Sequence, residues 1–148
     1  MATLHERIET PLPLQETFDF IADFSNSAHW DPGVATATRL DDGPLGTGSR
    51  FDLGVRMAGR VSQMEYVITT WQPPQRVVLT GSGSGVAAVD DIRFEATAAG
   101  TVVDYTADIR LRGALRLVAP LTGGTFARIA RDARDGMQRA LDERATAG

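Results

Sequence analysis

The sequence contains no cysteine and no lysine, and it has only two histidines in 148 residues. The absence of cysteine excludes disulfide bonds, thiolate catalysis and cysteine-based metal sites. All fifteen basic residues are arginine, and the formal net charge is −4. These arginines are dispersed among acidic residues and form no basic stripe of the kind that follows a phosphate backbone, so we expect no nucleic-acid partner.

Long hydrophobic runs are also missing. The first ten residues, MATLHERIET, lack the basic and apolar regions of a signal peptide, and no apolar run reaches the roughly 18 residues of a membrane span. We therefore expect a soluble, cytoplasmic protein with no membrane span. The length suits a single domain over residues 1–148, which would bury roughly 68 to 70% of the surface of its unfolded chain and have room for a cavity.

Common catalytic and cofactor motifs are absent as well. Gly46-Thr47-Gly48 lacks the strand-to-helix context of a dinucleotide-binding loop, and without lysine there is no phosphate-binding P-loop. No serine has a histidine partner in a recognisable hydrolase motif. His5 and His29 form no metal-binding pattern with other residues, so we expect neither a metal nor a cofactor.

The strongest pattern present is a long amphipathic helix near the C-terminus, predicted over Pro120 to Arg144. Its apolar residues recur at steps of three and four, and arginine and aspartate occupy the opposite face. The apolar positions are Phe126, Ile129, Ala130, Ala133, Met137, Ala140 and Leu141. One helix cannot bury such a stripe alone, so a curved sheet is expected to wrap around it. Gly136, inside this helix, either leaves space for a ligand or lets a strand approach closely.

Upstream, the chain alternates between apolar and polar residues, which predicts β-strands. After a first strand over 3–9, residues 13–24 and a short segment ending near Trp30 show helical spacing and predict two short helices. Six further strands are expected at 34–40, 49–58, 60–71, 76–83, 86–97 and 101–112. Short turns rich in glycine, proline and aspartate separate them, which predicts an antiparallel meander with one apolar face. The Gly-rich segment over 81–85 is expected to be a hairpin bend over the end of the long helix.

This order of elements resembles the helix-grip fold of the START-like (SRPBCC) superfamily, which includes the polyketide cyclase/dehydrase group and the birch-pollen allergen. The matching segments are Thr17 to Asp23, His29 to Val34, Gly46 to Phe51, Trp71 to Val77, and Arg112 to Pro120. The resemblance implies an α+β fold, with a seven-stranded curved antiparallel sheet around one long C-terminal helix and two short helices between strands 1 and 2. It also implies an apolar cavity between the sheet and the long helix.

Asp90 is the strongest candidate for a catalytic residue. In the segment over 86–97 it takes an inward position between Ala88 and Ile92, where a carboxylate would be desolvated and its pKa raised, as general acid or base catalysis requires. One alternative is a bulge that shifts the register and points Asp91 inward, or neither residue. Another is that Asp90 forms hydrogen bonds with the backbone of a turn.

Three other residues are weighed against purely structural roles. Tyr105 falls on the apolar face of the last strand, so its hydroxyl could bind a ligand or belong to the core. The strand over 60–71 is ambiguous, because Met64, Tyr66 and Ile68 compete with Glu65, Val67 and Trp71 for the inside. Glu65 becomes a cavity carboxylate if the second set faces inward. His29 could titrate near neutral pH or be a capping or surface residue.

Three functions remain open at this point. The first is binding of an apolar small molecule, such as a lipid or polyketide, in the cavity. The second is a polyketide cyclase/dehydratase-like enzyme with Asp90 and Tyr105 as catalytic residues, and the third is binding of a protein partner. The expected cavity residues are Phe18, Ile21, Trp30, Phe51, Leu53, Tyr66, Ile92, Phe94, Ile109, Phe126, Ile129, Ala133 and Met137. An exposed edge strand would also offer a pairing surface for a homodimer.

Overall fold

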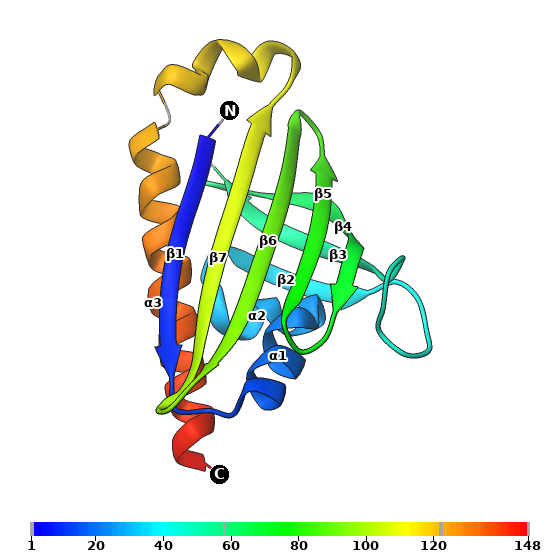
Figure 1. The fold of residues 1–148 in the computed structure, drawn as a ribbon. Coiled ribbons are helices and arrows are strands. Elements are labelled where there is room, and N and C mark those ends of the chain that lie inside the picture. The colour runs from blue at the N-terminus through cyan, green and yellow to red at the C-terminus, as the bar shows by residue number, and fades with distance from the viewer. Residues whose placement is uncertain (1, 58, 122, 148) are drawn as a thin grey trace.

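The structure, a computed structural model, describes residues 2–57, 59–121 and 123–147. Seven strands form one antiparallel sheet in the order β1-β7-β6-β5-β4-β3-β2 (Figure 1). The elements are β1 (Ala2–Thr10), α1 (Leu14–Ala22), η1 (Phe24–Asn26), α2 (Ser27–Trp30), β2 (Val34–Arg39), β3 (Arg50–Met57), β4 (Arg60–Gln72), β5 (Arg76–Gly83), β6 (Val86–Thr97), β7 (Gly100–Leu111), η2 (Gly113–Leu121) and α3 (Gly123–Ala147). The predicted helix-grip fold is confirmed.

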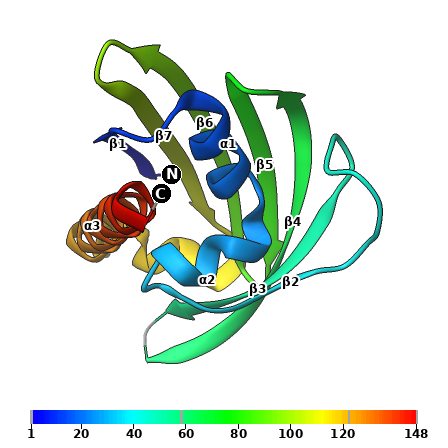
Figure 2. The same ribbon diagram turned by 90° about the horizontal axis from the view of Figure 1, so that it is seen from below.

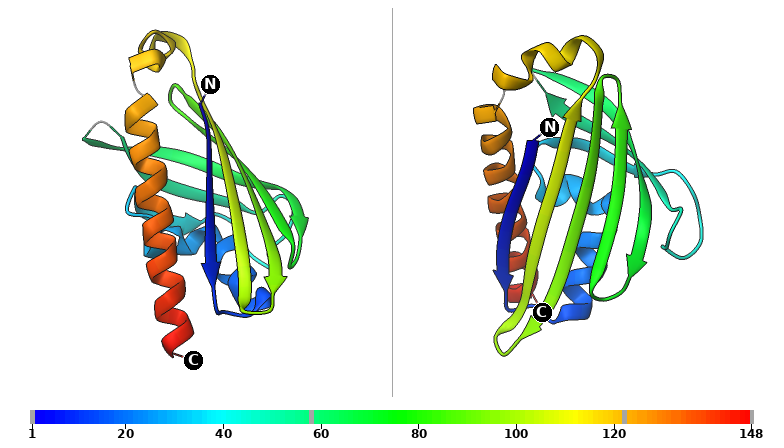
Figure 3. Two further views of the ribbon diagram at one scale, coloured as in Figure 1. Left: turned by 60° about the vertical axis from the view of Figure 1, so that its left-hand side comes forward. Right: turned by 45° about the horizontal axis from the view of Figure 1, so that its top comes forward.

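The sheet curves around its contents, with α1 and α2 on its concave side and α3 beside its β1 edge (Figure 2). Helix α3 runs along β1, where Gln138 Nε2 donates a hydrogen bond to the Glu9 backbone oxygen at 2.7 Å (Figure 3). Phe18 of α1 packs its ring 5.1 Å from both Trp71 and Phe94, measured between ring centroids. Helix α1 therefore fills one part of the concave face, and α3 covers another.

A bulge in β4 resolves the ambiguity of that strand. Met64, Tyr66 and Ile68 are buried, whereas Glu65 is exposed. The pairing with β5 then shifts between Ile68 and Thr70, so that Trp71 lies opposite the buried Val77. An extra residue in one strand reverses which side chains face inward. Met64, Tyr66 and Ile68 therefore face inward, which is the first of the two predicted alternatives. Beyond the bulge Trp71, which belongs to the second alternative, also faces inward.

The ends of α3 and the Gly-rich turn differ from expectation. Helix α3 begins at Gly123, and Pro120 belongs to the preceding 3₁₀-helix η2, which the sequence patterns did not predict. The turn between β5 and β6 was expected to cover the end of the long helix. It instead meets η2, because the Arg112 N–H donates to the Gly85 oxygen at 2.8 Å and Leu115 packs over Gly85.

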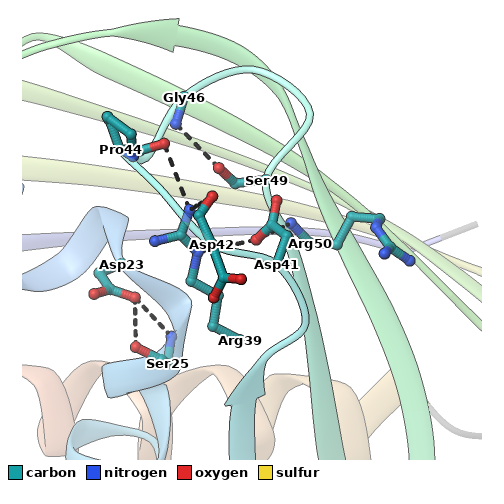
Figure 4. A network of polar contacts seen from close by, with 9 residues as sticks. All are labelled: Asp23, Ser25, Arg39, Asp41, Asp42, Pro44, Gly46, Ser49 and Arg50. Atoms are coloured by element: carbon teal, nitrogen blue, oxygen red, sulfur yellow. Dashed lines mark hydrogen bonds and ion pairs between the residues drawn. The ribbon is translucent and has the colours of Figure 1, made fainter.

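The loop between β2 and β3 is held by a local polar network (Figure 4). Arg39 Nε contacts Asp41 Oδ1 at 2.9 Å, and its Nη2 donates to the Asp42 and Pro44 backbone oxygens at 3.3 and 3.5 Å. Ser49 Oγ accepts a hydrogen bond from the Gly46 N–H at 3.1 Å. These contacts give the loop a defined path into β3. In the parts of the chain that the structure describes, no helix is both long and apolar enough to cross a membrane.

Gly136 marks the contact between α3 and the end of α2. A Cβ atom at this position would overlap the Trp30 backbone oxygen and lie 3.0 Å from Pro32 Cδ. The sequence left two explanations open for this glycine, space for a ligand or close approach of a strand. The structure shows a third, the close approach of a helix end.

Replacing Gly136 with alanine should destabilise the protein, although alanine usually favours a helix. We expect a loss of about 1 to 3 kcal/mol in the free energy of unfolding, because the methyl group forces α2 and α3 apart. Gly124→Ala is the control: a Cβ there meets nothing within 4 Å, so the variant should gain up to about 1 kcal/mol. Denaturant unfolding measures both, and equal effects of the two substitutions would contradict the packing argument.

Candidate functional site

A cavity of about 150 Å³ lies between the concave face of the sheet, the α2 region and α3. Most of its wall is apolar. The lining residues are Leu4, Glu6, Ile8, Phe24, Ser27, Trp30, Asp31, Gly33, Val34, Leu53, Val55, Arg56, Met57, Met64, Tyr66, Val86, Ala88, Asp90, Tyr105, Ala107, Ile109, Phe126, Ile129, Ala130, Ala133, Arg134 and Met137. The wall thus combines apolar surface with a small number of polar groups, which is typical of small-molecule sites.

The expected cavity residues fall into two groups. The structure places Trp30, Leu53, Tyr66, Ile109, Phe126, Ile129, Ala133 and Met137 on the cavity wall, together with Asp90 and Tyr105. It places Phe18, Ile21, Phe51, Ile92 and Phe94 in the packed core instead. These five were expected to line the cavity, but α1 and η1 occupy that part of the concave face, where Phe18 of α1 packs against Phe94 and Phe24 of η1 packs against Phe51.

Asp90, which is buried, and Tyr105, which is partly buried, form a pair on this wall. Strand β6 runs in regular register here, with Asp90 opposite Leu79 of β5 and Ala107 of β7, so no bulge turns Asp90 away. The Tyr105 hydroxyl donates a hydrogen bond to Asp90 Oδ2 at 2.5 Å. Asp91 instead faces the other side, where Arg76 Nε and Nη2 bind its carboxylate at 3.0 and 2.9 Å.

The two neighbouring carboxyl groups on β6 differ in their pKa. Burial raises the pKa of Asp90 from 3.8 to about 7, the hydrogen bond from Tyr105 works in the opposite direction, and the charges of Asp31 and Asp108 add to the rise. The hydrogen bond from Arg76 lowers the pKa of Asp91. Burial also keeps the pKa of Tyr105 well above 10, so this hydroxyl remains a donor at neutral pH. Asp90 alone of the two is able to exchange a proton near pH 7.

A second carboxyl group, Asp31, lies on the cavity wall directly after α2. Its Oδ1 accepts a hydrogen bond from the Gly33 N–H at 2.8 Å. Burial raises its pKa to about 6, whereas the Gly33 hydrogen bond lowers it, and Asp132 and Arg56 have smaller, opposing effects. Sequence reasoning missed Asp31 as a site residue, because Asp31-Pro32-Gly33 has the composition of an ordinary turn.

Trp30 is buried beside this carboxyl group, with 4% of its surface exposed. Its ring meets the Tyr105 ring edge-on, with centroids 6.0 Å apart. The indole N–H is buried and has no hydrogen-bond partner among the described residues. Trp30 was expected on the cavity wall, but nothing in the sequence indicated that its N–H would be unpartnered.

The remaining candidates lie away from the cavity. His29 is exposed on α2 and does not line the wall. Glu65 faces the opposite side of the sheet, where its Oε1 lies 3.5 Å from Arg50 Nη1. Within the described residues, no three or more histidine, aspartate or glutamate side chains are grouped so as to hold a metal ion. The polar chemistry of the site is therefore carried by carboxyl, phenol and indole groups.

Comparison with known proteins identifies a family over nearly the whole chain and a relative over part of it. A family model described as polyketide cyclase / dehydrase and lipid transport matches residues 1–145. An uncharacterized protein of Mycobacterium tuberculosis is 29% identical over 86 residues, and this match spans 57% of the chain and 59% of the relative's length.

Solved structures with little sequence similarity share the fold. A START superfamily protein from Mycobacterium smegmatis has a TM-score of 0.75 at 14% identity, covering 98% of this chain and 97% of that one. The Zhui aromatase/cyclase from Streptomyces sp. R1128 has a TM-score of 0.74 at 14% identity, covering 95% and 90%. Ara h 8.0201 has a TM-score of 0.70 at 16% identity, covering 99% of each chain.

Proposed function

Because the chain belongs to the polyketide cyclase / dehydrase and lipid transport family, we propose that it binds an apolar small molecule in the cavity between the sheet and α3. The observation that carries this proposal is the cavity itself, whose wall is mostly aliphatic and aromatic. Apolar surface that faces such a space gains contacts and loses water when a ligand enters. The buried polar groups on the wall would then orient the ligand rather than supply most of the affinity.

The size of the cavity limits the ligand. Protein cavities of roughly 150 Å³ accept a molecule about as large as benzene, and the cavity here has a volume of about 150 Å³. The part of the ligand that is enclosed in this conformation is therefore about one ring in size. A longer ligand would extend outward or require the walls to move.

A polyketide cyclase/dehydratase-like enzyme is the second candidate, and the Asp90–Tyr105 pair favours it. Asp90 has a pKa of about 7, close to the value at which one group serves as both acid and base in neutral solution. The solved aromatase/cyclase shares the fold of this chain. Under this alternative, Asp90→Asn would remove turnover while a neutral apolar probe still bound.

Native mass spectrometry of the purified protein, followed by extraction and identification of bound molecules, tests the proposed function. We expect a co-purifying apolar molecule of small size, because an accessible apolar cavity retains such ligands. If the protein is empty, one-ring apolar probes should be added and their binding measured by calorimetry. An empty protein that also binds none of these probes would overturn the proposal.

A further inference from the structure

The aromatic residues of the cavity wall gather around Asp90. Tyr105 binds Asp90 Oδ2 through its hydroxyl, and the Trp30 ring lies edge-on to Tyr105 at 6.0 Å. Burial raises the pKa of the Tyr66 hydroxyl, and the charge of Asp90 adds to this rise. All of these residues line the cavity. An apolar space with several aromatic rings and a carboxylate is the arrangement by which proteins hold organic ammonium groups.

Asp90 also lacks a positive partner. None of the ion pairs formed by the described residues includes it, and the other charges that act on its pKa are the aspartates Asp31 and Asp108. A desolvated carboxylate of this kind costs free energy unless a cation or hydrogen-bond donors compensate for it. Tyr105 supplies one donor, to Oδ2.

The arginines of the cavity wall have other partners. Arg56 Nη1 donates to the Pro32 backbone oxygen at 2.6 Å. Arg134 Nη2 lies 2.8 Å from Asp135 Oδ1, and its Nη1 lies 3.8 Å from Glu6 Oε2. The wall therefore has a carboxyl group that forms no ion pair with a cation of the described residues, next to rings that favour a positive charge.

We propose that the ligand is an apolar amine, whose ammonium group binds the Asp90 carboxylate among the rings of Trp30, Tyr66 and Tyr105 while its apolar body fills the cavity. This inference rests on the proposed binding function and adds the chemical class of the ligand. The ammonium supplies both the missing positive charge and N–H donors for Asp90. A carboxylate ligand of the same shape would meet like charge at the same place, and a neutral alcohol could supply only a single hydrogen bond.

The pH dependence of binding follows from the groups that face Asp90. On the cavity wall these groups are Tyr105 of β7, Tyr66 of β4, Asp31 after α2, Arg56 of β3, Glu6 of β1 and Arg134 of α3. Asp108 of β7 acts on Asp90 through its charge from the other face of the sheet. A primary alkylamine is protonated below about pH 10, as lysine is. Asp90 ionises near pH 7 and Asp31 near pH 6. Amine affinity should therefore fall as the pH drops below about 7, because a proton must leave Asp90 before the ammonium binds.

Three probes with the same one-ring apolar body test the inference: benzylamine, benzyl alcohol and benzoate, each titrated by calorimetry into the full chain at pH 8 and pH 5.5. At pH 8 we expect the amine to bind at least about 10-fold more tightly than the alcohol, and the carboxylate to bind most weakly. At pH 5.5 the preference for the amine over the alcohol should shrink by about 10-fold or more, since little of Asp90 is then ionised.

Matched variants distinguish an effect of the Asp90 charge on amine binding from an effect of surface charge in general. Asp90→Asn should remove the preference for the amine and keep the alcohol bound, whereas Asp91→Asn, the next residue on the opposite face, should keep the preference. If the alcohol binds as tightly as the amine at pH 8, or the carboxylate binds best, the inference is wrong while the proposed function stands. If none of the three probes binds, the proposed function fails and the inference fails with it.

Discussion

The Asp90→Asn variant should be more stable than the wild-type protein at pH 8, and the difference should become small near pH 4. Burial raises the folded-state pKa of Asp90 from 3.8 to about 7. Between these values the folded state holds a proton that the unfolded state has lost, so the unfolding free energy of the wild type decreases as the pH rises. Above pH 7 the full cost applies, up to about 4 kcal/mol at 1.36 kcal/mol per pKa unit. Asparagine carries no charge to desolvate.

Asp91→Asn is the matched control, because the Asp91 carboxylate should change the stability with pH in the opposite direction to Asp90. The hydrogen bond from Arg76 lowers the pKa of Asp91, so this carboxylate stabilises the folded state above its unfolded pKa and loses that contribution as the pH falls. The variant should therefore be less stable than wild type at pH 8. Denaturant unfolding at several pH values measures both substitutions. A stability difference between Asp90→Asn and wild type that does not change with pH would show that Asp90 is not desolvated.

Replacing Met137 with tryptophan should abolish ligand binding while the fold is retained. Met137 lies on the cavity wall at the middle of α3 and is almost fully buried. An indole in its place would occupy much of the roughly 150 Å³ cavity, so we expect affinity for a one-ring probe to fall by at least about 100-fold. The larger side chain should cost about 1 to 3 kcal/mol of stability, the usual range for overpacking. The cost should not exceed this range, because part of the indole enters the open space of the cavity.

The control for this variant is Arg139→Trp, two residues further along α3 and exposed to solvent. It adds the same side chain to the same helix but outside the cavity, and it should leave binding unchanged. Calorimetry with benzyl alcohol measures affinity, and circular dichroism checks that both variants fold. Unchanged binding by Met137→Trp would show that probes bind elsewhere on the protein.

The strands, and the side chains that point into the core from them, could be predicted because the two-residue alternation of apolar and polar residues is a local property of the sequence. Val86, Ala88 and Ile92 are buried on β6, as their spacing predicts, and Asp90 is buried between them. The same reasoning was insufficient in β4. One extra residue near Thr69 shifts the pairing, and the sequence there contains no glycine or proline that would indicate a bulge.

The boundary between core and cavity could not be predicted, since it depends on which helix fills which part of the concave face. Phe18 and Met137 have the same helical periodicity, yet Phe18 packs between Trp71 and Phe94 while Met137 faces the cavity. Asp31 was missed for a related reason. Its raised pKa arises from burial against parts of the chain that are distant in sequence, and the local composition does not predict that packing.

The pairing of the first strand with the last has a consequence for how the protein folds. Strand β1 pairs only with β7, so that Thr3 lies opposite Asp108, whereas β3 to β7 join neighbours along the chain through short turns. During synthesis the hairpins can form as they emerge, but β1 has no partner until nearly the whole sheet exists. Closing this long loop should therefore be a late step in folding, and the cavity, which needs β1, β7 and α3 together, can form only after it.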